Sequence, residues 1–210
     1  KISSKQAIQK IKDKHLKKID RTALLAIISS HNIINSLKSN KNIGVNIGSS
    51  RGATTIFENI HKEFIIKGHS SIPVNTSPLT TLGNISSEVA NYFSINSINI
   101  SHSVTCSTGL QALLNSIAYI KAGYTKKMLC GASEAANTDF VIAQMDALKI
   151  YSKDTSSQYP CRPFNIENLN TFVLGEAAVS LIIEPLKNSS NPLAIIESIG
   201  FAHVKPNSLT

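Results

Sequence analysis

Cys106 is the residue of this sequence whose position best suits nucleophilic chemistry. It lies in NISHSVTCSTGLQALL (99–114), where a strand-like alternation leads into a long helical pattern, and the small residues Ser107, Thr108 and Gly109 follow it directly. The first N–H groups of a helix lack partners within the helix, and the helix dipole favours negative charge there. A thiolate would be stabilised at this place, and the same N–H groups could hold an oxyanion when the sulfur attacks a thioester carbonyl. The pattern therefore predicts a nucleophile, although a free cysteine is more often a small buried hydrophobe.

The other cysteines and the nearest histidine fit this chemistry less well. Cys130 lies in an apolar strand-like stretch and is expected to be buried, whereas Cys161 lies in a loop beside Arg162. Three widely spaced cysteines without a CxxC pair or a zinc-like grouping predict free thiols in a reducing, cytoplasmic compartment and no metal site. His102 lies four residues before Cys106, on the same face of the expected strand. We expect it to be a packing or interface histidine.

The elements that must position these residues alternate between strand and helix. Strands are expected over 43–48, 98–105, 126–133, 172–186 and 193–204. Helices are expected over 53–68, 85–94, 107–123 and 139–150, and over 3–38 with a break near residues 18–20, where Asp20 would cap the second part. This order predicts an α/β layered lobe with a largely parallel central sheet, whose last two strands could pair as a hairpin.

Composition limits the remaining possibilities. A chain of 210 residues with 42% hydrophobic and 16% charged residues suits one globular domain or one lobe of a larger one. No apolar run approaches the length of a membrane span, and no secretory signal pattern is present at the start. The net charge of +8 is concentrated in residues 1–21, which hold eight basic residues and two acidic ones. This segment is either a solvated helix face or a patch for an acidic partner; the absence of interleaved aromatic residues disfavours nucleic acid.

Several motifs together resemble a known family. VTCSTGLQALLNSIAYIKAGYTKKMLCGASEA (104–135) resembles the nucleophile region of β-ketoacyl synthases in residue order and spacing, including the final Gly-x-x-Glu turn at residues 131–134. CRPFN (161–165) and FVLGEAAVSLIIE (172–184) are similar to the family's Arg-Pro-Phe segment and Gly-Glu-Gly strand. Two upstream segments resemble the early helix and the helix before the nucleophile strand: DRTALLA (20–26) and TTLGNISSEVANYF (80–93).

The resemblance implies a thiolase-like fold. In that fold two related βαβαβαββ halves form one five-layered α/β/α/β/α subunit, which is usually dimeric. Residues 1–210 would then be one N-terminal ketoacyl synthase domain, with residues 1–20 as a basic helical lead-in and without the C-terminal half. The implied activity is an acyl transfer without a cofactor: a decarboxylating condensation of an acyl thioester with malonyl-acyl carrier protein. It would give 3-oxoacyl-acyl carrier protein in fatty acid, polyketide or polyene biosynthesis.

The family's functional residues carry over to four positions. Cys106 becomes the acyl-accepting nucleophile, Glu176 the acidic residue that supports the site from behind, Phe172 a residue of the acyl pocket, and Arg51 a residue bordering that pocket. The Gly-Glu-Gly strand departs from the family pattern, because Ala177 replaces its second glycine. The family also uses two histidines and a lysine from the second half of the fold, and none of the six histidines here lies in a matching motif.

Other interpretations stay open. A thiolase-type acyltransferase shares the fold and the nucleophilic cysteine, but the segments at 161–165 and 172–184 favour the decarboxylating family. A non-catalytic subunit that shapes chain length in a heterodimer would explain the missing histidines, although such subunits usually lack the cysteine. An isolated lobe that only binds a carrier protein is the third. The expected partners are the acidic acyl carrier protein, which suits a basic surface, and a second subunit in a homodimer or heterodimer.

Overall fold

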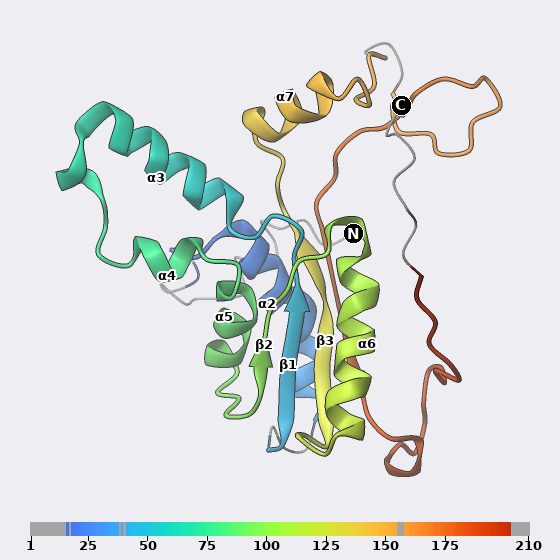
Figure 1. Ribbon diagram of the computed structural model, residues 1–210. Helices are drawn as coiled ribbons and strands as arrows, with labels where there is room; N and C mark the ends of the chain where they lie inside the picture. The colour runs from blue at the N-terminus through green and yellow to red at the C-terminus, as the bar shows by residue number, and fades with distance from the viewer. Residues whose placement is uncertain (1–15, 17, 38, 40, 155–157, 203–210) are drawn as a thin grey trace.

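The computed structural model describes residues 16, 18–37, 39, 41–154 and 158–202. Most of the basic lead-in, the first part of the helix expected over 3–38, and the end of the strand expected over 193–204 lie outside these residues. The described part forms a four-stranded sheet with helices on both faces (Figure 1). No helix in this part is long and apolar enough to cross a membrane.

The sheet has the strand order β2-β1-β3-β4. β1 pairs in parallel with β2 and β3, and β3 pairs antiparallel with β4. This confirms the α/β lobe with a largely parallel sheet. β1 is buried along its whole length, as expected for a parallel strand covered on both faces. The strands are β1 (Ile43–Gly48), β2 (Asn99–Ile100), β3 (Lys127–Glu134) and β4 (Ala177–Ile183).

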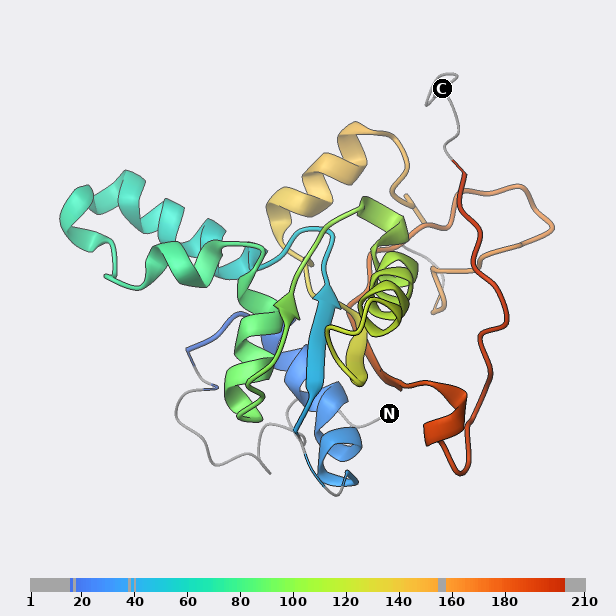
Figure 2. The same cartoon turned by 60° about the horizontal axis from the view of Figure 1, so that its bottom comes forward.

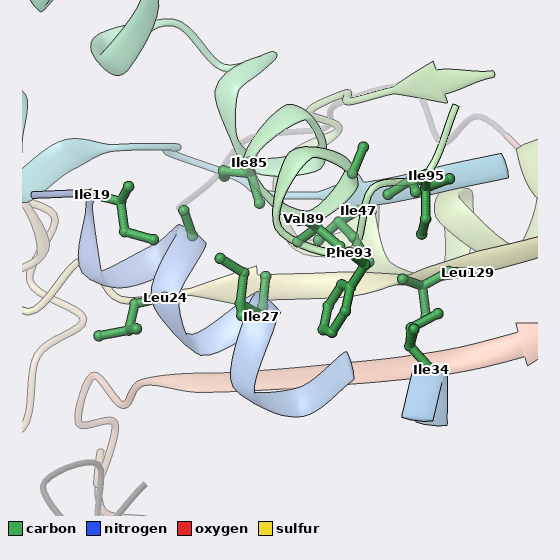
Figure 3. Close-up of a cluster of buried hydrophobic side chains, with 14 of the residues drawn as sticks. Ile19, Leu24, Ile27, Ile34, Ile47, Ile85, Val89, Phe93, Ile95 and Leu129 are labelled. Atoms are coloured by element: carbon green, nitrogen blue, oxygen red, sulfur yellow. The ribbon is translucent and has the colours of Figure 1, made fainter. Parts of the chain in front are cut away.

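Two helices cover one face of the sheet and enclose the apolar core. α2 (Arg21–Asn35) and α5 (Asn84–Tyr92) pack there against side chains of β1 and β3 (Figure 3). α2 begins where predicted, because the Asp20 carboxylate accepts a hydrogen bond of 2.7 Å from the Thr22 N–H. The core contains fully buried branched residues from four elements: Ile27, Ile43, Val45, Ile47, Ile85, Val89 and Leu129.

The opposite face is covered by α6 (Thr108–Lys121), which packs alongside β1 and β3 (Figure 2). Its buried residues are the small Thr108, Ala112 and Ser116, spaced by four and therefore on one side of the helix. α6 gives way to a left-handed glycine, Gly123, with φ of 81°. Small residues facing the sheet allow the α6 backbone to approach β1 closely.

The remaining elements extend beyond this layered centre. α3 (Thr54–Lys67) projects sideways and returns through η2 (His69–Ser71) and α4 (Thr76–Thr80) to α5 (Figure 1). α7 (Asp139–Ala147) follows β3, and η4 (Leu186–Asn188) follows β4. Both segments lie outside the stack formed by α2, the sheet and α6.

Three strand predictions are wrong in part. The strand expected over 172–186 is confined to β4, because residues 172–176 form no strand. The segment 193–202 forms no strand and no hairpin with β4, and its apolar side chains are exposed; among the described residues no strand pairs with its backbone. The strand expected over 98–105 is reduced to β2. Beyond it, the hydroxyl groups of Ser101 and Ser103 bond backbone atoms of Ser86 and Ser50, outside any strand pairing.

Candidate active site

Cys106 lies in a short 3-10 turn, η3 (Thr105–Ser107), immediately before α6, and its side chain is exposed. The sequence predicted Cys106 where a strand leads into the helix expected over 107–123; a 3-10 turn at a helix N-terminus is a common variation. Thr108 holds this turn through its hydroxyl, which donates to the Thr105 carbonyl at 2.6 Å and accepts from the Val104 N–H at 2.9 Å. The sulfur is therefore reachable from solvent on a hydrogen-bonded turn.

The backbone just before the sulfur is in a strained conformation. Thr105 has φ of 47°, in the left-handed region that β-branched residues rarely occupy. Such a residue costs on the order of 1–3 kcal/mol and persists only where surrounding contacts hold it. The two hydrogen bonds of the Thr108 hydroxyl are such contacts.

Loops that follow β1, β2 and β3 meet at the carboxyl ends of these parallel strands. The Ser49 N–H donates to the His102 carbonyl at 3.2 Å, and the Ser103 hydroxyl donates to the Ser50 carbonyl at 2.9 Å. Glu134, the last residue of β3, accepts from the Ser50 N–H at 2.7 Å and from the Ser49 hydroxyl at 3.2 Å. Clefts at this edge of an α/β sheet are where ligands bind in open sheets of this kind.

Burial raises the pKa of the Glu134 carboxyl above its ordinary value of 4.5, and hydrogen bonds from Ser50 and Ser49 lower it to a smaller extent. From the sequence, Glu134 was recognised only as the last residue of the Gly-x-x-Glu turn, with no role assigned to it. In the structure it fixes the loop after β1, which in turn contacts the segment that leads to Cys106.

His102 also has a defined place. Its Nδ1 lies 3.1 Å from Oδ1 of Asn46 on β1, and its Nε2 lies 3.1 Å from the carbonyl oxygen of Thr108. The Asn46 amide Nδ2 donates to the Ala112 carbonyl at 3.2 Å. The expected packing histidine thus contacts Thr108, the residue that directly follows the nucleophile turn (Thr105–Ser107). A polar residue in the middle of the apolar strand IGVNIG was the one signal that could have pointed to this contact.

The other predicted site residues lie on neighbouring elements. Arg51 donates from Nη1 to Oε1 of Gln144 on α7 at 2.7 Å. Phe172 is 40% exposed and meets Tyr151 edge to face, with ring centroids 6.3 Å apart. In the part of the chain that the structure describes, neither residue has a hydrogen bond or ring contact with Cys106.

Glu176 precedes β4 and pairs with the first residue of α2. Its Oε2 lies 2.6 Å from Nε of Arg21. This ion pair joins α2 to the start of β4, and Glu176 makes no hydrogen bond to the nucleophile turn among the described contacts. The supporting role of Glu176 stays a prediction.

The two other cysteines differ in exposure. Cys130 is fully buried on β3, and burial raises the pKa of its thiol to about 11, partly offset by a hydrogen bond with Ser116. Cys161 is exposed, next to Arg162, whose guanidinium pairs with Asp154 at 3.2 Å. All three thiols are free. No cluster of metal-ligating side chains occurs in the described residues.

Comparison with known proteins gives the family. Residues 3–189 match the model described as β-ketoacyl synthase, N-terminal domain. The chain belongs to the β-ketoacyl synthase family. It is 28% identical over 185 residues to 3-oxoacyl-[acyl-carrier-protein] synthase 2 of Staphylococcus aureus, covering 85% of this chain and 46% of that protein. It is also 28% identical over 205 residues to the enzyme of the same name from Synechocystis, covering 93% of this chain and 49% of that protein.

Solved structures confirm the thiolase-like fold of this ketoacyl synthase domain. The ishigamide ketosynthase/chain length factor matches with a TM-score of 0.68 at 16% identity, over 88% of this chain and 49% of that one. A β-ketoacyl synthase from Burkholderia phymatum STM815 matches with a TM-score of 0.68 at 20% identity, over 81% of this chain and 43% of that one. The chain thus spans about half the length of the relatives it matches, as expected for one half of the five-layered fold.

Proposed function

We propose that this chain accepts an acyl group on Cys106 as the first stage of a decarboxylating condensation that yields a 3-oxoacyl-acyl carrier protein. One observation carries the proposal: the exposed Cys106 sulfur lies on a turn that leads directly into α6, a helix of 14 residues. Amide groups at such a helix start stabilise a thiolate and an oxyanion. The family match and the names of the relatives support the substrate class.

The chemistry divides into two stages. In the first, the Cys106 thiolate attacks the carbonyl carbon of an acyl thioester on acyl carrier protein. A new C–S bond forms, the bond to the carrier sulfur breaks, and the carrier thiol takes up the proton that Cys106 has lost. Splitting the reaction through an acyl-enzyme replaces one difficult step by two easier ones.

In the second stage a malonyl thioester loses carbon dioxide. The carbanion left by the broken C–C bond attacks the acyl carbon, the C–S bond to Cys106 breaks, and the sulfur takes up a proton. The resemblance assigns the histidines and the lysine that assist this stage to the second half of the family fold. The first stage, acyl transfer to Cys106, can therefore be tested on this chain by itself.

The other site residues and partners belong to the same proposal. Phe172 and Arg51 would border the acyl pocket, and Glu176 would support the site through its ion pair with Arg21. Acyl carrier protein would be the partner, together with a second related subunit in a homodimer or heterodimer, in the cytoplasm. A type II polyketide ketosynthase of known structure, which matches with a TM-score of 0.67, is described in complex with its acyl-carrier protein. The net charge of +8 suits an acidic carrier.

The test is acyl transfer from a carrier protein. The full chain is incubated with acyl carrier protein that carries a short acyl group, and its peptides are analysed by mass spectrometry. We expect the acyl mass on the Cys106 peptide, and not on the peptides of Cys130 or Cys161. Cys106→Ser should abolish the transfer, whereas the matched variant Cys161→Ser, which removes the other exposed thiol, should retain it.

Stability measurements make the result decisive. Cys106 is exposed, so its replacement should change the free energy of unfolding by less than about 0.5 kcal/mol. If Cys106 reacts with a thiol reagent but never accepts the acyl group, the non-catalytic interpretations are favoured. Gross unfolding of Cys106→Ser would instead show that the residue is part of the core.

A further inference from the structure

The His102 ring lies between two hydrogen-bond acceptors. Nδ1 is 3.1 Å from Oδ1 of Asn46, and Nε2 is 3.1 Å from the carbonyl oxygen of Thr108. The orientation of the Asn46 amide follows from its other contact, because Nδ2 donates to the Ala112 carbonyl at 3.2 Å. If the Asn46 amide were flipped, its Oδ1 would face the carbonyl oxygen of Ala112, and neither atom could donate a hydrogen bond. Both ring nitrogens of His102 therefore face oxygen.

A neutral imidazole carries one N–H and one lone pair, so it can donate to only one of these oxygens. The doubly protonated ring donates to both. We propose that His102, as an imidazolium, is a positioning residue that ties β1 to the first turn of α6 and so fixes the turn that carries Cys106. This inference rests on the proposed role of Cys106 as the nucleophile.

The hydrogen bond from His102 to α6 is made to Thr108, the residue whose hydroxyl holds the nucleophile turn. The Thr108 hydroxyl bonds the backbone of Val104 and Thr105, on the N-terminal side of the sulfur, and the Thr108 carbonyl receives the His102 bond. Gly48 leaves room for this arrangement, because a Cβ there would lie 3.1 Å from atoms of the His102 ring. A hydrogen bond to a charged donor is stronger than a neutral one.

Few titratable side chains on the neighbouring elements lie close to the His102 ring. β1 carries no titratable side chain, and those of α6, Tyr119 and Lys121, lie three turns beyond Thr108. On β3, Cys130 is opposite Asn46 and its raised pKa of about 11 keeps it neutral, while Glu134 is bonded to the loop after β1. Cys106 is the titratable group of the turn itself.

A coupling between the two groups follows. While His102 is an imidazolium, both of its hydrogen bonds hold the start of α6 against β1 and so hold the turn that carries Cys106. When the ring loses a proton, one of the two hydrogen bonds is lost, and the turn that carries Cys106 is held less firmly. We therefore expect the rise in Cys106 reactivity with pH to be partly offset over the range, about pH 5 to 8, in which imidazole side chains titrate.

Alkylation of Cys106 by iodoacetamide, followed by peptide mass spectrometry between pH 5.5 and 8.5, tests the proposal on the full chain. For an isolated thiol the rate constant rises about tenfold per pH unit below the thiol pKa. We expect a clearly shallower rise at Cys106 in the wild type and the full rise in His102→Gln, whose amide does not titrate. At pH 6 the variant should react about tenfold more slowly, which corresponds to about 1.4 kcal/mol. The exposed Cys161 in the same sample is an internal control and should not change.

Two further variants sharpen the result. His69→Gln removes an exposed histidine of η2 and should retain the wild-type profile. Asn46→Ala removes one of the two acceptors, so that a neutral ring satisfies the other, and should restore the full rise even if His102→Gln fails to fold. Equal slopes for Cys106 in the wild type and in the folded variants would overturn the proposal, as would a change shared by Cys161. Because alkylation needs no carrier protein, failure of acyl transfer with an intact coupling would reject the proposed function alone.

Discussion

Replacement of Gly48 by alanine perturbs the place where β1 approaches the start of α6. A Cβ at Gly48 would overlap the Cγ2 methyl of Thr108 and would lie 3.1 Å from Cε1 and Nε2 of His102. Thr108 is buried, is the first residue of α6, and is β-branched, so its χ1 cannot rotate freely to make room. The α6 terminus or β1 itself must move instead.

The size of the effect follows from this overlap. Carbon atoms settle at about 3.5–4.0 Å, so relief of the clash requires a movement on the order of 1 Å. Forcing a methyl into a close-packed place costs about 1–3 kcal/mol of unfolding free energy. A displacement of about 1 Å at a reacting group can reduce the rate on the order of 100-fold. We therefore expect a moderate loss of stability and a much larger loss of Cys106 acylation.

Urea unfolding and the rate of acyl transfer to Cys106 measure the two effects in the same preparation. Gly109→Ala is the matched control, because its Cβ would lie 3.5 Å from the Ala132 Cβ, which is ordinary contact. Alanine in a helix is favoured over glycine by about 0.5–1 kcal/mol, so this variant should be at least as stable as the wild type. A Gly48→Ala protein with wild-type stability and rate would refute the close packing on which this reasoning depends.

Three other predictions concern groups with clear environments. Glu134 has a raised pKa in the folded chain, so its contribution to the free energy of unfolding is fully present below its ordinary pKa of 4.5 and is lost as pH rises through the folded pKa. Glu134→Gln should remove this loss of stability. Urea unfolding at a series of pH values from 4 to 8 measures it. Cys130 should resist iodoacetamide at pH 8 in the folded chain and react only with denaturant present, whereas Cys161 reacts at once. Ile27 is completely buried, so Ile27→Ala should cost about 2–5 kcal/mol of unfolding free energy, while the folded fraction should alkylate at Cys106 at the wild-type rate.

The sequence predicted the elements that depend on local patterns. The run from 107 to 123 has strong helical periodicity with a terminal glycine, and α6 occupies it with a difference of one or two residues. Asp20 was recognisable as a cap because capping is a contact between neighbours in the chain. Cys106 could be placed before a helix start for the same reason. The alternation of apolar and polar residues over 193–202 predicted a strand that does not form. A strand requires a partner strand, and the local sequence pattern does not show whether one is available.

Contacts between distant segments were not predictable. The bond between His102 and Asn46 joins residues 56 apart, and the bond of Glu134 to the Ser50 N–H joins residues 84 apart. Strand alternation gave the face of His102, but it did not show which face of β1 meets α6. The assignment of Glu176 to the site rested on the family resemblance, whereas its contact with Arg21 depends on how β4 lies against α2.

The two faces of β1 serve different purposes, and this division explains where the site is built. Val45 and its neighbours at positions 43 and 47 point to the α2 and α5 side and form the apolar core. The alternate residues Gly44, Asn46 and Gly48 face the other side, where they offer no apolar bulk. Helix α6 consequently approaches closely enough for its carbonyl groups to accept hydrogen bonds from side chains of the sheet and its loops. Apolar burial on one face stabilises the fold, whereas directional hydrogen bonds on the other face set the position of the Cys106 sulfur. A substitution on the core face should therefore mainly lower the free energy of unfolding, and one on the α6 face should mainly change the reactivity of Cys106.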